Sequence, residues 1–287
     1  MSARGSESGV VLVNVLVILA IAGGLMLLMV TSQDASLDRV SRSADASIAE
    51  QIAFGAEASV IDALRRDLDD APDIDHLNEA WAVGVVQDKV ELPTGTFSVH
   101  LADLQAKFDI NQLAFATAGT QQFARRLMIA LDQPPEIASQ IGRILGAVGR
   151  VSALQDLAAF GIPQTAIDAM RPYVTALPVI GTVNLNSVDP FLLSVMMQNE
   201  SHARQVIRIR ESRGFVSLEA MRDAGVLRPQ NSGFTSDVYR IEVLAEAGTA
   251  QIGMHTIVVR RNQPGIKAVD ILERRFAPRQ SGASNRE

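Results

Sequence analysis

The chain has 287 residues, of which 47% are hydrophobic, and a formal net charge of −6. The length suits one elaborate domain or two smaller ones, and the negative charge gives no general attraction for nucleic acid. The chain contains no cysteine, which excludes disulfides, zinc–thiolate sites and cysteine nucleophiles. Its four histidines are scattered, and it has no Walker loop, dinucleotide-binding glycine motif or Gly-x-Ser-x-Gly.

The first predicted element is an apolar run from Val10 to Val30, in which Asn14 is the one strongly polar residue. At about 1.5 Å per residue, a helix of this length spans about 30 Å, the thickness of a bilayer core. The run is longer than the apolar part of a secretory signal, about 7–15 residues, and no convincing small-residue cleavage site follows it. It therefore predicts a membrane-spanning helix, and Arg4 before it weakly favours an N-terminus on the cytoplasmic side.

The helical pattern continues beyond the apolar run. No proline occurs between Met1 and Ala71, and Asp69, Asp70 and Pro72 indicate the end of the helix. Apolar residues at spacings of three and four predict one buried stripe along its second half. This stripe consists of Leu37, Val40, Ala44, Ile48, Ile52, Ala56, Val60, Leu64 and Leu68.

This layout resembles the prepilin-type subunits of type IV pili and type II secretion pseudopili. The resemblance implies that residues 1–9 are a leader, that prepilin peptidase cleaves between Gly9 and Val10, and that the new amine of Val10 is methylated. Asn14 then stands at the fifth position, where most members have a glutamate that pairs with the amine of a neighbouring subunit. An amide cannot neutralise that amine. Asn14 is therefore either a polar contact between helices or the mark of a subunit at the filament tip.

The segment from Asp67 to Asp75 contains five aspartates in nine residues. Calcium prefers oxygen ligands, but this run does not match the spacing of an EF-hand and lacks its glycine and closing glutamate. We therefore favour a solvated helix end over a metal site.

The next block runs from Trp81 through Leu92-Pro93-Thr94-Gly95 to Asp103-Leu104-Gln105 and Leu113. Pro93 to Gly95 predict a turn, and the alternation of Phe97, Val99 and Leu101 predicts a strand. The order of these motifs resembles type II secretion protein K, a family that usually has asparagine where Asp109 stands. The segment Pro178–Ser187, with its Val-Asn-Leu-Asn sequence, resembles the same family.

Residues 113–237 are predicted to be helical, with Asn186 or Ser187 capping a helix that begins near Pro190 and Ser217 capping the last helix. This stretch also resembles helix-hairpin-helix DNA-binding modules, whose glycine-rich turn binds a phosphate. Here the turn would be Gln198–His202, which has no glycine and includes Glu200. An earlier copy has a proline, Pro163, in its turn, which removes an amide donor. We therefore favour a packing role over DNA binding, with Arg204, Arg208 and Arg210 on a solvated face.

Three strands are predicted near the C-terminus: residues 238–245, 250–261 and 266–276. Turn residues at Gly248 and around Pro264 separate them, so they are expected to form an antiparallel meander that pairs with the strand near Phe97. Residues 278–287 are rich in Ser, Gly and Arg and are expected to be disordered. The arginines of these strands are expected to be solubilising charges at strand ends; they are Arg260, Arg261, Arg274 and Arg275.

The predicted fold class is α+β: a pilin-like fold with a long N-terminal transmembrane helix, an antiparallel sheet and an inserted all-α domain similar to SAM and helix-hairpin-helix modules. The predicted division is a leader (1–9), the N-terminal helix (10–70), a first pilin-like part (71–112), the helical insertion (113–237), the C-terminal strands (238–277) and the tail (278–287).

The resemblance to protein K implies a minor pseudopilin without enzymatic activity, anchored by one span in the inner membrane with its head in the periplasm. Its implied partners are minor pseudopilins I and J at the filament tip, minor pseudopilin H, the major pseudopilin G filament and prepilin peptidase, and no nucleic acid. Its implied role is to cap the pseudopilus and promote its assembly. The alternatives are a tip minor pilin of a type IV pilus or competence system, and a membrane-anchored DNA-binding protein.

No cofactor is expected from the residues. Calcium is associated with the helical domain of protein K, but the Asp-Trp-Ile-Asp-like motif of that family is absent between Leu113 and Pro178. The family's calcium ligands therefore cannot be assigned to residues of this chain.

Overall fold

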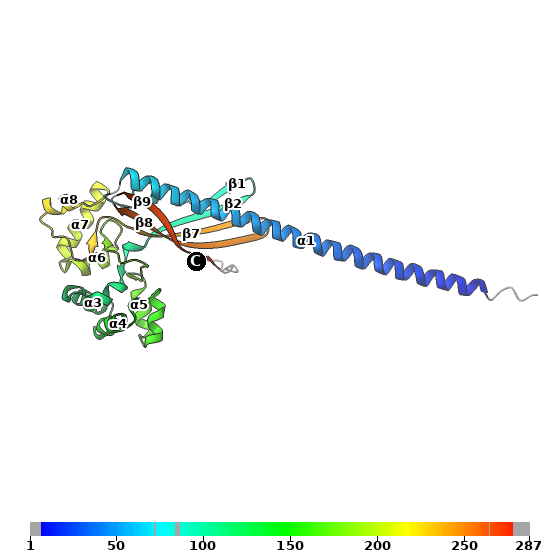
Figure 1. Cartoon of the computed structure of the whole chain (residues 1–287), viewed down its shortest axis with the longest axis horizontal. Coiled ribbons are helices and arrows are strands. Elements are labelled where there is room, and N and C mark those ends of the chain that lie inside the picture. Colours follow the sequence, from blue (N-terminus) through cyan, green and yellow to red (C-terminus); the bar gives the residue numbers. More distant parts are fainter. Residues whose placement is uncertain (1–6, 72, 84–86, 264, 278–287) are drawn as a thin grey trace, which may run out of the picture.

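The computed structural model describes residues 7–71, 73–83, 87–263 and 265–277. Helix α1 (Glu7–Asp70) extends far beyond the rest of the molecule, and its N-terminal half has no other element beside it (Figure 1). Every side chain from Leu12 to Ala44 is exposed. In the described part of the chain, α1 alone is long and apolar enough to cross a membrane, by length and composition. The predicted end of this helix at Asp70 is confirmed.

The apolar stripe of α1 is buried only along its last third. Ile52, Ala56, Val60, Leu64 and Leu68 are at most 9% exposed, and they pack against the sheet. Leu37 and Val40 continue the same stripe, but each is 67% exposed. The head therefore covers only the C-terminal end of the predicted apolar face.

The sheet has five antiparallel strands in the order β1-β2-β7-β8-β9. The strands are β1 (Gln87–Leu92), β2 (Gly95–Asp103), β7 (Val238–Ala247), β8 (Ala250–Gln263) and β9 (Ile266–Ala277). The predicted C-terminal meander and its pairing with the strand near Phe97 are confirmed, since Phe97 is the register partner of Ala245. Strand β1 was not predicted, because its sequence Gln-Asp-Lys-Val-Glu-Leu lacks apolar alternation.

The first core lies between α1 and this sheet. Trp81, in the short helix α2 (Ala80–Val83), packs on Tyr239 with their ring centroids 5.2 Å apart. At the other end of the sheet, Asp45 of α1 accepts a hydrogen bond from the amide of Thr249 at 3.0 Å. Gly248 in the same turn has a φ of +52°, and a Cβ there would overlap the Asp45 carboxylate. This turn is thus fitted closely to the helix.

The second core lies in a helical domain inserted between β2 and β7. Its α-helices are α3 (Ala118–Ala130), α4 (Glu136–Val148), α5 (Gln164–Met170), α6 (Pro190–Met197), α7 (Glu200–Arg213) and α8 (Leu218–Asp223). It also contains the 3₁₀ helices η1 (Leu104–Ala106), η2 (Ile110–Phe115) and η3 (Leu154–Phe160). Two parallel pairs of two-residue strands were not predicted from the sequence. They are β3 (Phe108–Asp109) with β4 (Val174–Thr175), and β5 (Val183–Asn184) with β6 (Ser232–Gly233).

The helical domain lies at the end of the sheet that is farthest from the protruding half of α1 (Figure 1). The two chain connections to it are neighbours in the sheet, because Asp103 is the register partner of Tyr239. The bulk of the domain is therefore placed away from the predicted membrane.

Candidate functional site

The residues predicted for processing lie in α1. Gly9 and Val10 are in its first turns, and Asn14 is exposed on the protruding part. Residues 1–6 of the predicted leader are outside the described residues. Cleavage, methylation and the role of Asn14 therefore remain predictions.

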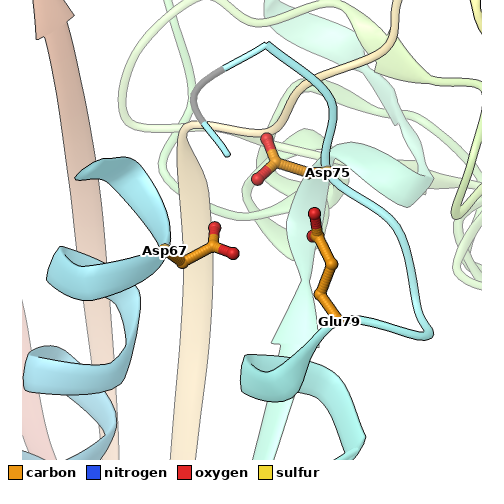
Figure 2. A group of neighbouring side chains, drawn as sticks. All are labelled: Asp67, Asp75 and Glu79. Atoms are coloured by element: carbon orange, nitrogen blue, oxygen red, sulfur yellow. The ribbon is translucent and has the colours of Figure 1, made fainter. Parts of the chain in front are cut away.

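A carboxylate cluster forms where α1 ends. Asp67 of α1, Asp75 of the following loop and Glu79 each place one oxygen within 4.8 Å of the others. Figure 2 shows the three side chains pointing toward one another. Asp75 is 0% exposed, so its charge requires a partner inside the protein.

Arg260 of β8 supplies that partner. Its Nη1 donates to Asp67 Oδ2 at 2.6 Å, and its Nη2 donates to both oxygens of Asp75. Arg260 is itself 3% exposed and lies over the Tyr239 ring, 5.3 Å from its centroid. A cation of the chain thus pairs with two of the three carboxylates and balances part of their charge.

The surroundings of the cluster disfavour a negative charge on Asp67. Burial, and then the nearby Glu79, raise the pKa of Asp67 to about 7, while Arg260 lowers it. Glu79 accepts hydrogen bonds from Trp81 Nε1 at 2.6 Å and from the His76 amide at 2.9 Å. The cluster therefore ties together the end of α1, the loop after it and strand β8.

Two sequence predictions are wrong here. The acidic run is solvated at Asp69, Asp70 and Asp73 but not at Asp67 and Asp75, which pair with the buried Arg260. The prediction that the arginines of the C-terminal strands are all solubilising charges is therefore wrong for Arg260. It is also incomplete for Arg274, which pairs with the buried Glu57 of α1.

A second polar network holds the helical domain on the sheet. The Asp103 carboxylate at the end of β2 accepts hydrogen bonds from the hydroxyls of Ser187 and Ser236 and from Asn184 Nδ2. Asp75 joins this network, because its Oδ2 accepts from the Ser236 amide at 2.7 Å. Burial raises the pKa of Asp103, and the hydrogen bonds from the two serine hydroxyls lower it. The insertion is thus fixed to the end of α1 as well as to the sheet.

The turn between α6 and α7 is the candidate phosphate site of a helix-hairpin-helix module. Asn199 caps α7, and its side chain accepts from the amides of Ser201 at 2.9 Å and His202 at 3.2 Å. A phosphate would need these amides, which are already occupied. The geometry therefore agrees with a packing role for this turn.

Other predictions for these helices had mixed outcomes. The cap of Ser217 on α8 is confirmed, but α6 is capped by Asp189 and not by Asn186 or Ser187. Arg210 does not lie on a fully solvated face, since its Nη1 donates to the Val188 carbonyl at 2.8 Å.

Asp109 stands where the protein K family usually has asparagine, and it is 1% exposed. Its Oδ1 accepts from the amides of Asn111 at 3.0 Å and Leu177 at 3.1 Å, while its Oδ2 has no hydrogen-bond partner in the described structure. Burial raises the pKa of Asp109 to about 6, although hydrogen bonds from backbone amides, that of Leu177 first, and the charge of Arg150 lower it.

Comparisons with known proteins agree with the resemblance found in the sequence. No protein-family model matches the chain. Over 101 residues the chain is 31% identical to type II secretion system protein K of Pectobacterium carotovorum subsp. carotovorum, a match that covers 32% of this chain. The match spans only 31% of the length of that relative.

The fold is similar to that of a chain in the crystal structure of the GspK–GspI–GspJ complex from the enterotoxigenic Escherichia coli type 2 secretion system. The TM-score is 0.63 at 18% identity, over 84% of this chain and 100% of that chain. At this identity the structural match shows a shared fold. The predicted fold class, a long apolar N-terminal helix with an antiparallel sheet, is therefore confirmed, and so is the resemblance to protein K.

Proposed function

We propose that this chain is a minor pseudopilin of a type II secretion system, without enzymatic activity. The observation that carries this proposal is the division of α1 into an exposed N-terminal part with a long apolar run and a C-terminal third that packs on an antiparallel sheet. A chain of the GspK–GspI–GspJ complex shares this fold. The exposed apolar run would span the inner membrane, since an apolar helix free of other contacts is stable in lipid. The head would then lie in the periplasm.

The proposal includes processing of the N-terminus. Prepilin peptidase would remove residues 1–9, and the amine of Val10 would be methylated. The exposed segment of α1 between the membrane and the head would then pack against the corresponding helices of other pseudopilins. Its Leu37 and Val40, which the head leaves uncovered, would be part of that contact.

We also propose that the chain caps the pseudopilus tip with minor pseudopilins I and J, above minor pseudopilin H and the major pseudopilin G filament, and promotes assembly. The position of the helical domain supports this, because it adds bulk at the end of the head that points away from the membrane (Figure 1). Another subunit stacked on that end would have to displace the domain. Asn14 supports the same position, because an amide cannot neutralise the terminal amine of a further subunit.

The N-terminus of the mature protein tests the processing step. We expect the chain isolated from its native membrane to begin at methylated Val10, as read from its intact mass and N-terminal sequence. Gly9→Val should leave the chain unprocessed. Gly23→Val is the matched control, because a side chain at Gly23 meets nothing within 4 Å. A wild-type chain that still begins at Met1 would contradict the pseudopilin proposal.

Labelling tests the tip position. The natural chain has no cysteine, so a single cysteine at the exposed Ala159 of the helical domain can carry a gold particle. We expect one particle at one end of each pseudopilus in electron micrographs. Particles distributed along the filament would show that the chain is incorporated into the filament and would rule out the cap.

A further inference from the structure

The helical domain contains a groove that the proposed function does not use. Three segments line it: helix α3, the end of α6 with the start of α7, and the chain from Leu227 to Asn231 after α8. This last segment, called here the strap, lies directly on α3. A Cβ at Gly119 would overlap the Gln230 side chain, and Asn231 Nδ2 donates to Thr120 Oγ1 at 2.9 Å. The strap is therefore fixed against α3, and both line the groove.

The charged and titratable side chains in the groove are Arg126, His202 and Arg228, and its lining includes no carboxylate. Within the described residues, none of the three forms an ion pair, and Arg126 Nε is buried with no acceptor. Arg228 donates to a backbone carbonyl, that of Ser232, at 3.0 Å. A buried donor without an acceptor is uncommon in a folded protein and needs an explanation.

The acidic group nearest in sequence to these cations does not neutralise them. Glu200 stands two residues before His202, but its carboxylate pairs with Arg204 at 3.1 Å on the exposed face of α7. Burial lowers the pKa of Arg126, and no carboxylate opposes this effect. In a chain of net charge −6, the groove is thus a local site of uncompensated positive charge.

Apolar side chains accompany these cations. Phe123 and Met196 form part of the lining and are 8% and 6% exposed, and Met197 lies beside them. On the strap, Leu227 is 86% exposed although it is a large apolar residue. The groove can therefore receive a carboxylate and an adjacent apolar side chain together.

We propose that this groove binds an acidic peptide segment of a partner protein, in which carboxylates alternate with apolar side chains. Arg126 and Arg228 would pair with the carboxylates, and Leu227 with Met197 would contact the apolar side chains. A methionine-lined surface can adapt to different apolar side chains. This inference does not rest on the proposed position of the chain in a pseudopilus.

Nucleic acid fits the groove less well. Binding of a phosphate backbone uses a track of cations and free backbone amides. Here the amides of the α6–α7 turn are occupied by Asn199, and Glu200 lies at the same turn. The apolar residues of the groove and the exposed Leu227 also have no role in contacts with phosphate.

The test uses the full chain in lipid nanodiscs and a fluorescein-labelled, terminally blocked heptapeptide of alternating leucine and glutamate. A second peptide has glutamine in place of every glutamate. We expect fluorescence anisotropy to show at least tenfold tighter binding of the acidic peptide, weakened by added salt because the contacts are partly exposed ion pairs. Arg126→Gln should reduce the affinity for the acidic peptide part of the way to that of the glutamine peptide, because Arg228 remains, and should leave the binding of the glutamine peptide unchanged. Leu227→Ser should weaken the binding of both peptides.

Arg125→Gln is the matched control, because this neighbour is exposed and does not line the groove. It removes the same charge from the same helix and should leave the affinity unchanged. Equal binding of the two peptides, or an equal loss in Arg125→Gln and Arg126→Gln, would overturn the proposal. So would duplex DNA that binds through Arg126 and is not displaced by the acidic peptide. Circular dichroism of each variant confirms that the helical domain is folded.

Discussion

Replacing Asp109 by asparagine is expected to stabilise the helical domain at neutral pH. The Asp109 carboxylate is buried at the start of the insertion, and one of its oxygens has no hydrogen-bond partner among the described residues. An asparagine Oδ1 can accept the same two amide hydrogen bonds, from Asn111 and Leu177, and carries no charge. The substitution therefore removes the cost of a buried charge and keeps the contacts that hold the turn.

The magnitude follows from the pKa. Burial raises the pKa of Asp109 from 3.8 to about 6, and each unit corresponds to about 1.4 kcal/mol, so ionisation costs about 3 kcal/mol of stability. The new Nδ2 has no evident acceptor, which costs about 2 kcal/mol. We therefore expect a net gain in the free energy of unfolding of about 1 kcal/mol at pH 7.5.

The pH dependence gives a sharper test. The folded state keeps the proton of Asp109 to a higher pH than the unfolded chain does, so this group makes the wild type less stable as pH rises from about 4 to about 6. The variant lacks this loss. Its advantage of about 1 kcal/mol should therefore be present above about pH 6 and become a deficit of about 2 kcal/mol near pH 4, where only the cost of the unpaired Nδ2 remains.

Urea unfolding of the full chain in detergent, followed by circular dichroism at 222 nm between pH 4 and pH 8, measures this difference. Asp73→Asn removes the same charge at an exposed position and should not change the profile. A variant that is less stable than the wild type at pH 7.5 would refute the reasoning. So would a difference between variant and wild type that does not change with pH.

Three further substitutions test the contacts of the head. Arg260→Met should cost about 3–5 kcal/mol in urea unfolding followed by tryptophan fluorescence, because it leaves Asp75 buried without a counter-ion; a loss below 1 kcal/mol would contradict this role. Gly248→Ala should speed amide hydrogen exchange in the β7–β8 turn, because it strains the backbone and displaces Asp45. Asn199→Ala should lower the free energy of unfolding by about 1 kcal/mol, since α7 loses its cap. The same variant should gain no DNA binding, and a gain in an anisotropy assay would show that the capped amides block a phosphate site.

Local patterns in the sequence predicted most of the framework. Spacings of three and four with Asp70 and Pro72 at the end predicted the boundary of α1, and turn residues at Gly248 and around Pro264 separated the predicted strands β7, β8 and β9. The cap of Ser217 followed from residue preference. The cap of α6 could also have been found, because Pro190 favours the first helical position, which makes the preceding Asp189 the N-cap.

The carboxylate cluster could not be predicted in the same way. Asp67 and Arg260 are 193 residues apart, and no local pattern relates them. Each looks like a surface charge when it is considered with its neighbours in the sequence. The two residues become a buried ion pair only when the long helix and strand β8 come together. The groove near Arg126 could not be predicted either, because the strap reaches α3 from a distant part of the chain.

The register of β2 against β7 has a consequence for the order of folding. Asp103 and Tyr239 are paired in the sheet, yet the whole helical domain separates them along the chain. Closing an unstructured loop of roughly 130 residues would cost about 4 kcal/mol beyond a constant. Prior folding of the helical domain brings the two ends together and removes most of that cost. We therefore expect the sheet to be the slow step and the helical domain to act as the nucleus that joins its two halves.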